Sequence, residues 1–144
     1  MADRLTEKQR SILMSRVRTK HTAPELTVRS VAHRAGYRFS LHRKDLPGTP
    51  DIVFPRFTSV VFVHGCFWHQ HKGCSKSTQP ATRKKFWTAK LSRNMSRDAE
   101  NRKKLHKIGW RVLVIWECEI RNREMLAEKL KRFLDKSTPS SRVR

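Results

Sequence analysis

DIVFPRFTSVVFVHG, residues 51–65, is the stretch of sequence that decides the fold. It contains two short apolar runs, Asp51–Phe54 and Thr58–His64, which are bounded by proline and glycine and are typical of buried strands. Tyr37–Leu41 alternates polar and apolar residues with a period of two, which predicts another strand. Trp110–Trp116 is β-branched, aromatic and almost wholly apolar, and it is the strongest strand signal in the chain. The sequence therefore predicts four strands.

Helical signals mark four further segments, in which apolar residues recur at helical spacing beside capping residues or a closing glycine. These segments are residues 1–20, Thr22–Gly36, Thr82–Lys107 and Asn122–Leu134. The order of helix, helix, three strands, helix, strand and helix predicts an α/β domain with a central mixed β-sheet flanked by helices. We assign this domain to residues 21–135, a basic helical arm to residues 1–20, and a mobile tail to residues 136–144.

The charge balance indicates the kind of partner. The 144 residues contain 33 Lys and Arg against 12 Asp and Glu, a net charge of +21, and the pI is about 11.2. Such a chain is expected to bind a polyanion. Its apolar runs are too short to span a bilayer, no export signal is visible, and the cysteine count of three is odd. We therefore expect neither a membrane-spanning nor a secreted protein, nor a disulfide scaffold.

A sixteen-residue irregular segment, residues 65–80, carries two of the three cysteines, Cys66 and Cys74, and Cys118 follows the strongest strand. Three thiolates and one imidazole form a closed tetrahedral zinc set. His69 and His71 are both eligible as the fourth ligand. The alternative is that the cysteines are ordinary buried thiols.

Asp51 opens a predicted strand, and the next strand leads to His64 and then His69. Magnesium sites need one or two carboxylates, and a nearby histidine can take a proton from water. The alternative for Asp51 is a turn cap. Glu25 is explained by a capping box, and Asp98 by a solvated or ion-paired helix position, so spacing alone marks neither as catalytic.

Aromatic residues supply a third clue. Phe67 and Trp68 lie in the irregular segment, and Trp87 lies near the start of a predicted helix. Exposed aromatics on a basic protein can wedge between bases. The alternative is that these residues belong to the core, and for Phe67 and Trp68 the two interpretations are about equally favoured. For Trp110 and Trp116, in a strand, we favour the core. The excess of basic residues favours binding to phosphates.

Four sequence blocks in order, spread between about Thr6 and Leu134, resemble the very short patch repair endonucleases, the bacterial DNA mismatch nickases. The blocks are Leu46–Asp51, Phe62–His69, Pro80–Arg83 with Phe86 and Trp87, and Gly109–Cys118. The resemblance implies a restriction-endonuclease-like fold. It also implies magnesium-dependent hydrolysis of one phosphodiester bond beside the thymine of a T·G mispair, which arises from deaminated 5-methylcytosine.

The resemblance also implies roles for particular residues. Asp51 would hold Mg²⁺ together with the backbone carbonyl of Val63, His69 would be the general base, and His64 would lie near the phosphate. Glu25 and Asp98 would give acidic support, with Asp98 orienting His69. The structural Zn²⁺ ligands would be Cys66, His71, Cys74 and Cys118, and the residues that intercalate beside the mispair would be Phe67, Trp68, Trp87 and, on the arm, Met14.

The partner implied is double-stranded DNA with a T·G mismatch, and we expect a monomeric, cytoplasmic, nucleoid-associated protein of a bacterium. Two rival functions fit the composition equally well. One is a restriction or homing endonuclease that uses the same scaffold to cut both strands of a matched site. The other is a zinc-stabilised DNA-binding protein without catalysis. The pairing of Asp51 with His69, and the aromatic wedge, favour the mismatch nickase.

Overall fold

The computed structural model describes residues 22–136. The predicted arm, with Met14, and residues 137–144 of the predicted tail lie outside the described residues. The described elements are α2 (Ala23–Arg34), β1 (Ser40–Leu41), β2 (Ile52–Phe54), β3 (Ser59–His64), α3 (Lys84–Lys107), β4 (Arg111–Trp116) and α4 (Arg123–Lys136). Short 3₁₀ turns occupy Pro55–Phe57, Ser75–Ser77 and Glu117–Glu119. None of these described helices is long and apolar enough to cross a membrane.

The predicted central mixed sheet is confirmed. Its four strands lie in the order β1-β2-β3-β4. β1 pairs with β2 and β2 with β3 in antiparallel fashion, whereas β3 and β4 are parallel and are connected through α3. The register of the parallel pair places His64 opposite Trp116 at the end of both strands.

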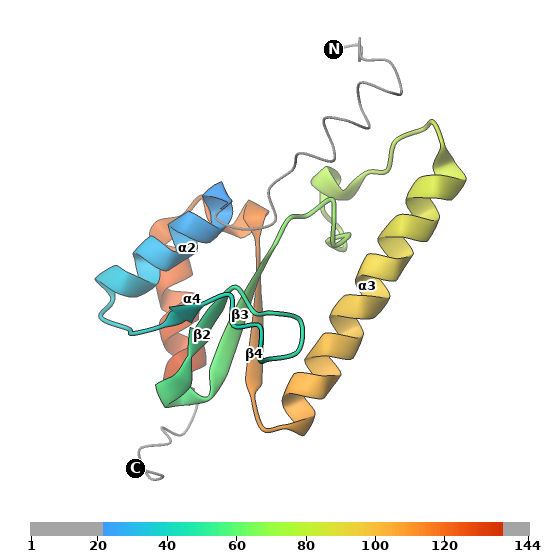
Figure 1. Ribbon diagram of the computed structural model, residues 1–144. Coiled ribbons are helices and arrows are strands. Elements are labelled where there is room, and N and C mark those ends of the chain that lie inside the picture. The colour runs from blue at the N-terminus through green and yellow to red at the C-terminus, as the bar shows by residue number, and fades with distance from the viewer. Residues whose placement is uncertain (1–21, 137–144) are drawn as a thin grey trace.

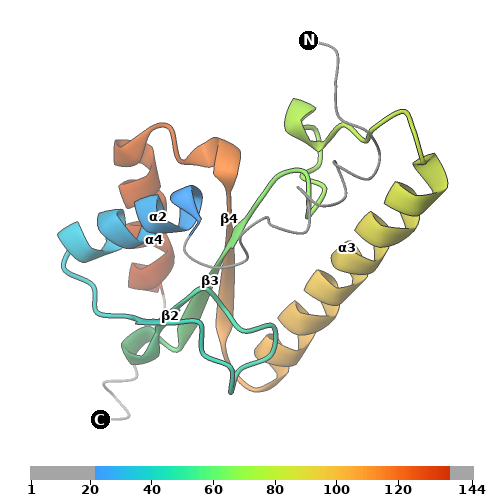
Figure 2. The same ribbon diagram turned by 45° about the horizontal axis from the view of Figure 1, so that its top comes forward.

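Helices cover both faces of the sheet: α2 and α4 lie against one face and α3 runs along the other (Figures 1 and 2). The alternation of side chains along β3 explains the two layers. Val61 packs with α2 and α4 in one core cluster, whereas Val60 and Phe62 pack with Leu105 of α3 in the other. Both faces are apolar, which is why β3 reads as a continuous apolar run rather than an alternating one.

Capping residues explain most of the helix boundaries. The Thr22 hydroxyl accepts from the backbone N–H of Glu25, and α2 closes before Gly36, whose φ is +90°. The Asn122 side chain accepts from the N–H of Met125 at the start of α4. The predicted cap at Thr82 is wrong, because α3 begins after Arg83 in a left-handed conformation without a side-chain cap.

The first predicted strand is shorter than Tyr37–Leu41. β2 contributes only three residues before Pro55, so it can pair with only a short partner. At the other end, His42 has a φ of +46°, which ends β1 after Leu41. Tyr37 and Phe39 instead pack on the core cluster of α2 and α4.

Candidate functional site

The candidate site lies at one end of the central strands, where residues from the start of α2 and from one side of α3 line the same cavity. His64 ends β3, and Asp51 comes just before β2, which runs antiparallel to β3, so both reach the same end. They line a cavity of about 1030 Å³ together with Glu25, His69 and Asp98. The structure thus brings all five predicted catalytic side chains to one cavity.

The carboxylate of Asp51 is largely withdrawn from water. Its Oδ2 accepts a 2.7 Å hydrogen bond from the backbone N–H of Val63. Burial raises the pKa of Asp51 to about 6, and the nearby Glu25 carboxylate adds to the rise, while the hydrogen bond from Val63 opposes it. A carboxylate with a raised pKa, facing a cavity, is prepared to bind a cation.

Glu25 is buried at the start of α2, with 2% of its surface exposed. Nε2 of His42 lies 2.9 Å from Oε2 of this carboxylate and 3.0 Å from Oε1. The guanidinium of Arg29 lies 3.3 Å from Oε2. Oxygen or nitrogen atoms of Glu25, His42 and Asp51 all lie within 4.8 Å of one another. The capping-box explanation therefore accounts for the backbone of Glu25, while its carboxylate belongs to the cavity.

His69 and His64 form a stacked imidazole pair. Their ring centroids lie 3.7 Å apart and the planes differ by 5°. Nδ1 of His69 lies 2.6 Å from Oδ2 of Asp98, so the carboxylate fixes the orientation of the ring. Nε2 is the ring nitrogen that Asp98 does not contact. Burial, and then the neighbouring His69, lower the pKa of His64 to about 3, so His64 is neutral at physiological pH.

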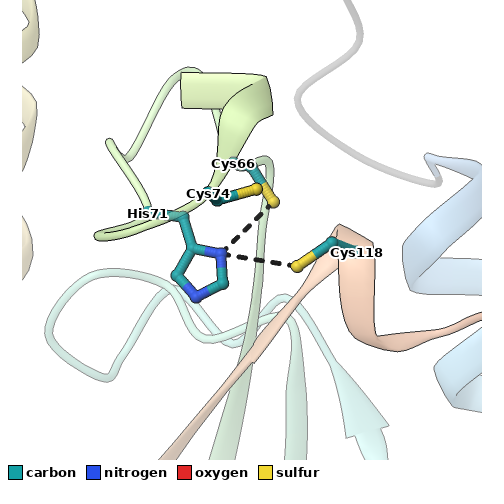
Figure 3. Close-up of side chains that lie close together, drawn as sticks. All are labelled: Cys66, His71, Cys74 and Cys118. Atoms are coloured by element: carbon teal, nitrogen blue, oxygen red, sulfur yellow. Dashed lines mark hydrogen bonds between the residues drawn. The ribbon is translucent and has the colours of Figure 1, made fainter. Parts of the chain in front are cut away.

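The segment after β3 brings a second set of side chains together. Cys66, His71, Cys74 and Cys118 converge from this segment and from the end of β4 (Figure 3). Their ligand atoms lie within 4.8 Å of one another. We call these four residues the thiol cluster. The structure places His71 in it, whereas His69 faces Asp98.

The spacing within the thiol cluster matches that of zinc ligands. Nδ1 of His71 lies 3.7 Å from the sulfur of Cys66 and 3.4 Å from that of Cys118. Ligands at usual Zn–N and Zn–S lengths with tetrahedral angles would lie about 3.6 Å apart. Burial raises the pKa of the Cys66 thiol to about 12, while hydrogen bonding to the backbone of Lys76 lowers that of Cys74. A bound cation would reverse the effect on Cys66.

The predicted wedge residues form one aromatic cluster. Phe67 packs edge-to-face on Trp68 and on Trp87, with centroids 5.1 Å and 5.4 Å apart. Phe67 and Trp68 are half-buried and line the cavity. Trp87 is only 6% exposed and lies beneath them, while Phe86 beside it is 42% exposed. The half-buried pair therefore forms the accessible part of the cluster.

One side of α3 lines the cavity with polar and basic residues. They are Lys90, Asn94, Arg97, Asp98, Asn101 and Arg102. This spacing of three or four residues places them along one helix face. Cationic side chains beside a carboxylate and an imidazole pair suit a phosphodiester substrate.

Sequence reasoning missed three residues of the site. His42 contacts Glu25, Asn94 donates to the backbone carbonyl of Trp68, and Glu117 accepts from the backbone N–H of Cys66. Each of these three contacts joins segments that lie far apart in the sequence. Only Glu117 carried a signal, since it immediately precedes a candidate metal ligand.

The strand tryptophans differ in their surroundings. Trp110 packs against the core cluster on the α3 face, as predicted. Trp116 is half-buried and lies between the ring of His71, stacked at 4.2 Å, and that of His64 at 5.2 Å. Its predicted place in the core is wrong, because the indole packs on these two imidazoles rather than in either apolar cluster.

Comparison with known proteins identifies the family. The model of the family described as DNA mismatch endonuclease Vsr matches residues 2–76. The chain belongs to this family. It is 40% identical over 129 residues to the DNA mismatch endonuclease Vsr of Escherichia coli, covering 90% of this chain and 82% of that protein.

Two further relatives are also similar to this chain along most of their length. The type II nicking enzyme V.XorIIP of Xanthomonas oryzae pv. oryzae is 50% identical over 137 residues, covering 95% of this chain and all of that protein. The type II nicking enzyme V.NmeAIP of Neisseria meningitidis is 40% identical over 134 residues, covering 93% of this chain and 95% of that protein. The family model ends at residue 76, and the similarity to these relatives extends beyond it over more than nine-tenths of the chain.

Proposed function

We propose that this chain is a DNA mismatch endonuclease that nicks one strand beside the thymine of a T·G mispair. The observation that carries the proposal is that Asp51 and His69 face one cavity lined by cationic residues of α3. Membership of a family whose named members are mismatch endonucleases and nicking enzymes supports DNA as the substrate. The mixed sheet flanked by helices is compatible with a restriction-endonuclease-like fold.

Asp51 would hold the catalytic Mg²⁺, with the backbone carbonyl of Val63 as a second ligand and Glu25 beside it. The donor chemistry fits, because Mg²⁺ prefers carboxylate and carbonyl oxygens and leaves places for water and phosphate. When bound, the ion supplies charge stabilisation at the phosphate and a lower pKa for the attacking water. The N–H of Val63 fixes the Asp51 carboxylate at 2.7 Å beforehand.

His69 would remove the proton from the attacking water through Nε2. Asp98 accepts from Nδ1–H, which fixes the tautomer with an unprotonated Nε2 and stabilises the imidazolium after the proton is taken. The neutral His64 ring lies against His69 and would donate a hydrogen bond to the phosphate. Lys90 and Arg97 of α3 would bind flanking phosphates.

The thiol cluster would hold a structural Zn²⁺. Three thiolates and one imidazole close a tetrahedral site and leave no place for substrate, so the ion would tie the segment after β3 to the end of β4. His69 is in that segment, two residues before His71, so the ion would fix the base indirectly.

The aromatic cluster would recognise the mispair. Phe67 and Trp68 are half-buried at the cavity, and Trp87 supports them from below. Apolar side chains inserted beside a base step unstack it, and a mispair costs less to unstack than a matched pair. Met14 would insert from the arm.

A duplex with one T·G mispair tests the proposal, with a matched T·A duplex as control. We expect Mg²⁺-dependent cutting of the thymine strand alone, and its loss in Asp51→Ala and His69→Ala. Asp45→Ala and His106→Ala are matched controls, since Asp45 pairs with Arg43 at the surface and His106 is an exposed residue of α3. Equal cutting of the matched duplex would favour a restriction or homing endonuclease. Binding without cutting would favour a DNA-binding module.

A further inference from the structure

We propose that Trp116 is a positioning residue that fixes the imidazole of His64, and through it that of His69, against the thiol cluster. The inference rests on the proposed function, since it assumes that the imidazole pair acts on the substrate. It assigns to Trp116 a role in the rate of the reaction rather than in binding DNA.

An unbroken series of ring contacts joins the thiol cluster to the imidazole pair. The rings of His71 and Trp116 are stacked, with centroids 4.2 Å apart and planes within 10°. Trp116 meets His64 edge-to-face at 5.2 Å, and His64 stacks on His69 at 3.7 Å. Among the rings of residues 22–136, Trp116 is thus the one that contacts both groups.

The backbone holds Trp116 at this point. β3 and β4 run parallel in a register that places Trp116 beside His64. The backbone N–H of Trp116 donates to Oε1 of Glu119 at 2.9 Å, and Lys129 of α4 pairs with Oε2 of the same carboxylate. The indole therefore starts from an anchored main-chain position.

His64 depends on such packing for its orientation. The ring is 5% exposed, and its buried Nδ1 has no hydrogen-bond partner among the described residues. His69, by contrast, has the Asp98 carboxylate on Nδ1. Because no polar contact fixes His64 on that side, the flanking rings of Trp116 and His69 set its angle.

A smaller side chain at position 116 would leave His64 free to tilt, and the stacked ring of His69 would lose its support on that face. A misplacement of about 1 Å in a reacting group can cost roughly a hundredfold in rate. We therefore expect Trp116→Leu to lower kcat by between about tenfold and a hundredfold with little change in KM for the mismatched duplex. Trp116→Phe keeps an aromatic edge and should retain most of the rate.

Trp110→Leu is the matched control. It removes an indole just before the same strand, at the opposite end, where Trp110 packs against the core cluster on the α3 face and beneath the guanidinium of Arg43. Neither imidazole touches it in the contacts between aromatic rings of residues 22–136. A general loss of β4 packing should appear in this variant, whereas a loss of imidazole positioning should not.

The decisive readout is independent of activity. In full-length protein labelled at histidine, we expect the ring-proton resonances of His64 and His69 to move toward unstructured-peptide values in Trp116→Leu, and to stay in place in Trp110→Leu. Elemental analysis checks that zinc content is kept. This measurement can be made even if the wild type nicks no mismatched DNA. A failure of the proposed function can therefore be told apart from a failure of the proposed role of Trp116.

Three results would overturn the proposal: unchanged imidazole resonances in Trp116→Leu, an equal fall in kcat for Trp110→Leu, or a rise in KM alone. A fourth result concerns the case in which Trp116→Leu loses its zinc. If Trp116→Phe then shows wild-type imidazole resonances but a kcat as low as that of Trp116→Leu, the proposal is also overturned. Loss of the His64 and His69 resonance positions and of the rate in Trp116→Leu, with zinc kept and with Trp116→Phe close to the wild type in both, would support it.

Discussion

Replacing Asp51 with asparagine should make the protein more stable at neutral pH while abolishing nicking. Burial raises the pKa of Asp51 to about 6 from its ordinary 3.8, and Glu25 lies beside it. The folded protein therefore binds a proton more tightly at this carboxyl than the unfolded chain does. Stability linked to Asp51 is greatest below pH 4 and falls as the pH rises toward 6.

The size of the effect follows from that difference. At 1.36 kcal/mol for each pKa unit, moving from 3.8 to about 6 corresponds to about 3 kcal/mol. This is an upper value for the gain in Asp51→Asn above pH 6, because the N–H of Val63 bonds less strongly to a neutral amide oxygen than to a carboxylate. Near pH 4 the two proteins should have nearly equal stability.

The assay is denaturant unfolding of both proteins at several pH values between 4 and 8, without added Mg²⁺ and without chelator, so that any zinc stays bound. Taking the difference between variant and wild type removes the opposing contribution of His64, whose lowered pKa makes stability rise with pH. Asp45→Asn, at an exposed carboxylate, should show no comparable gain. Adding Mg²⁺ should stabilise the wild type alone. A difference in stability that is the same at pH 4 and pH 8, or a less stable asparagine variant at pH 8, would refute the reasoning.

Three other predictions follow from the site. Asp98→Asn should lower kcat by about 10- to 100-fold without changing DNA affinity, because it removes only the partner of His69; single-turnover kinetics with a binding titration checks this. Cys118→Ser should lose the zinc, measured as about one ion per wild-type chain by elemental analysis, and should unfold at lower denaturant; a fully folded, metal-free wild type would contradict the zinc proposal. If about six phosphates are contacted, DNA affinity should fall by roughly 10³ between 50 and 200 mM salt, and a flat response in a filter-binding titration would count against a DNA partner.

The strands and most helix boundaries were predictable because their signals are local. The apolar run that ends at His64 identifies β3 wherever it pairs, and the hydroxyl of Thr22 caps α2 through a contact three residues away. The start of α3 was not predictable, since Arg83 takes a left-handed conformation that its side chain does not favour.

The ligand set shows where local reasoning ends. Three cysteines were identifiable from their residue type, but the sequence left His69 and His71 open. Gln70 has a φ of +51°, so the chain turns between the two histidines and sends them to different partners, Asp98 and the thiol cluster. A glutamine gives no signal for that conformation.

Residues with a sufficient local explanation were the hardest to assign. Glu25 fits a capping box and Asp98 fits a solvated helix position, and only tertiary packing reveals that both carboxylates face the cavity. Resemblance to a family marked them; spacing could not, because a carboxylate at a helix start has the same sequence signature whether it faces water or a buried histidine.

The apolar core, rather than the polar residues, determines which groups meet in the cavity. Along β3, Val61 and Val63 pack toward α2 and α4, so Phe62 and His64 must face α3. A slip of one residue in the pairing of β3 would turn the side chain of Val63 toward α3 and that of His64 into the core of α2 and α4, where a buried imidazole without partners would be costly. The same apolar residues that hold the sheet together therefore specify the register that brings His64 beside Trp116 and over His69.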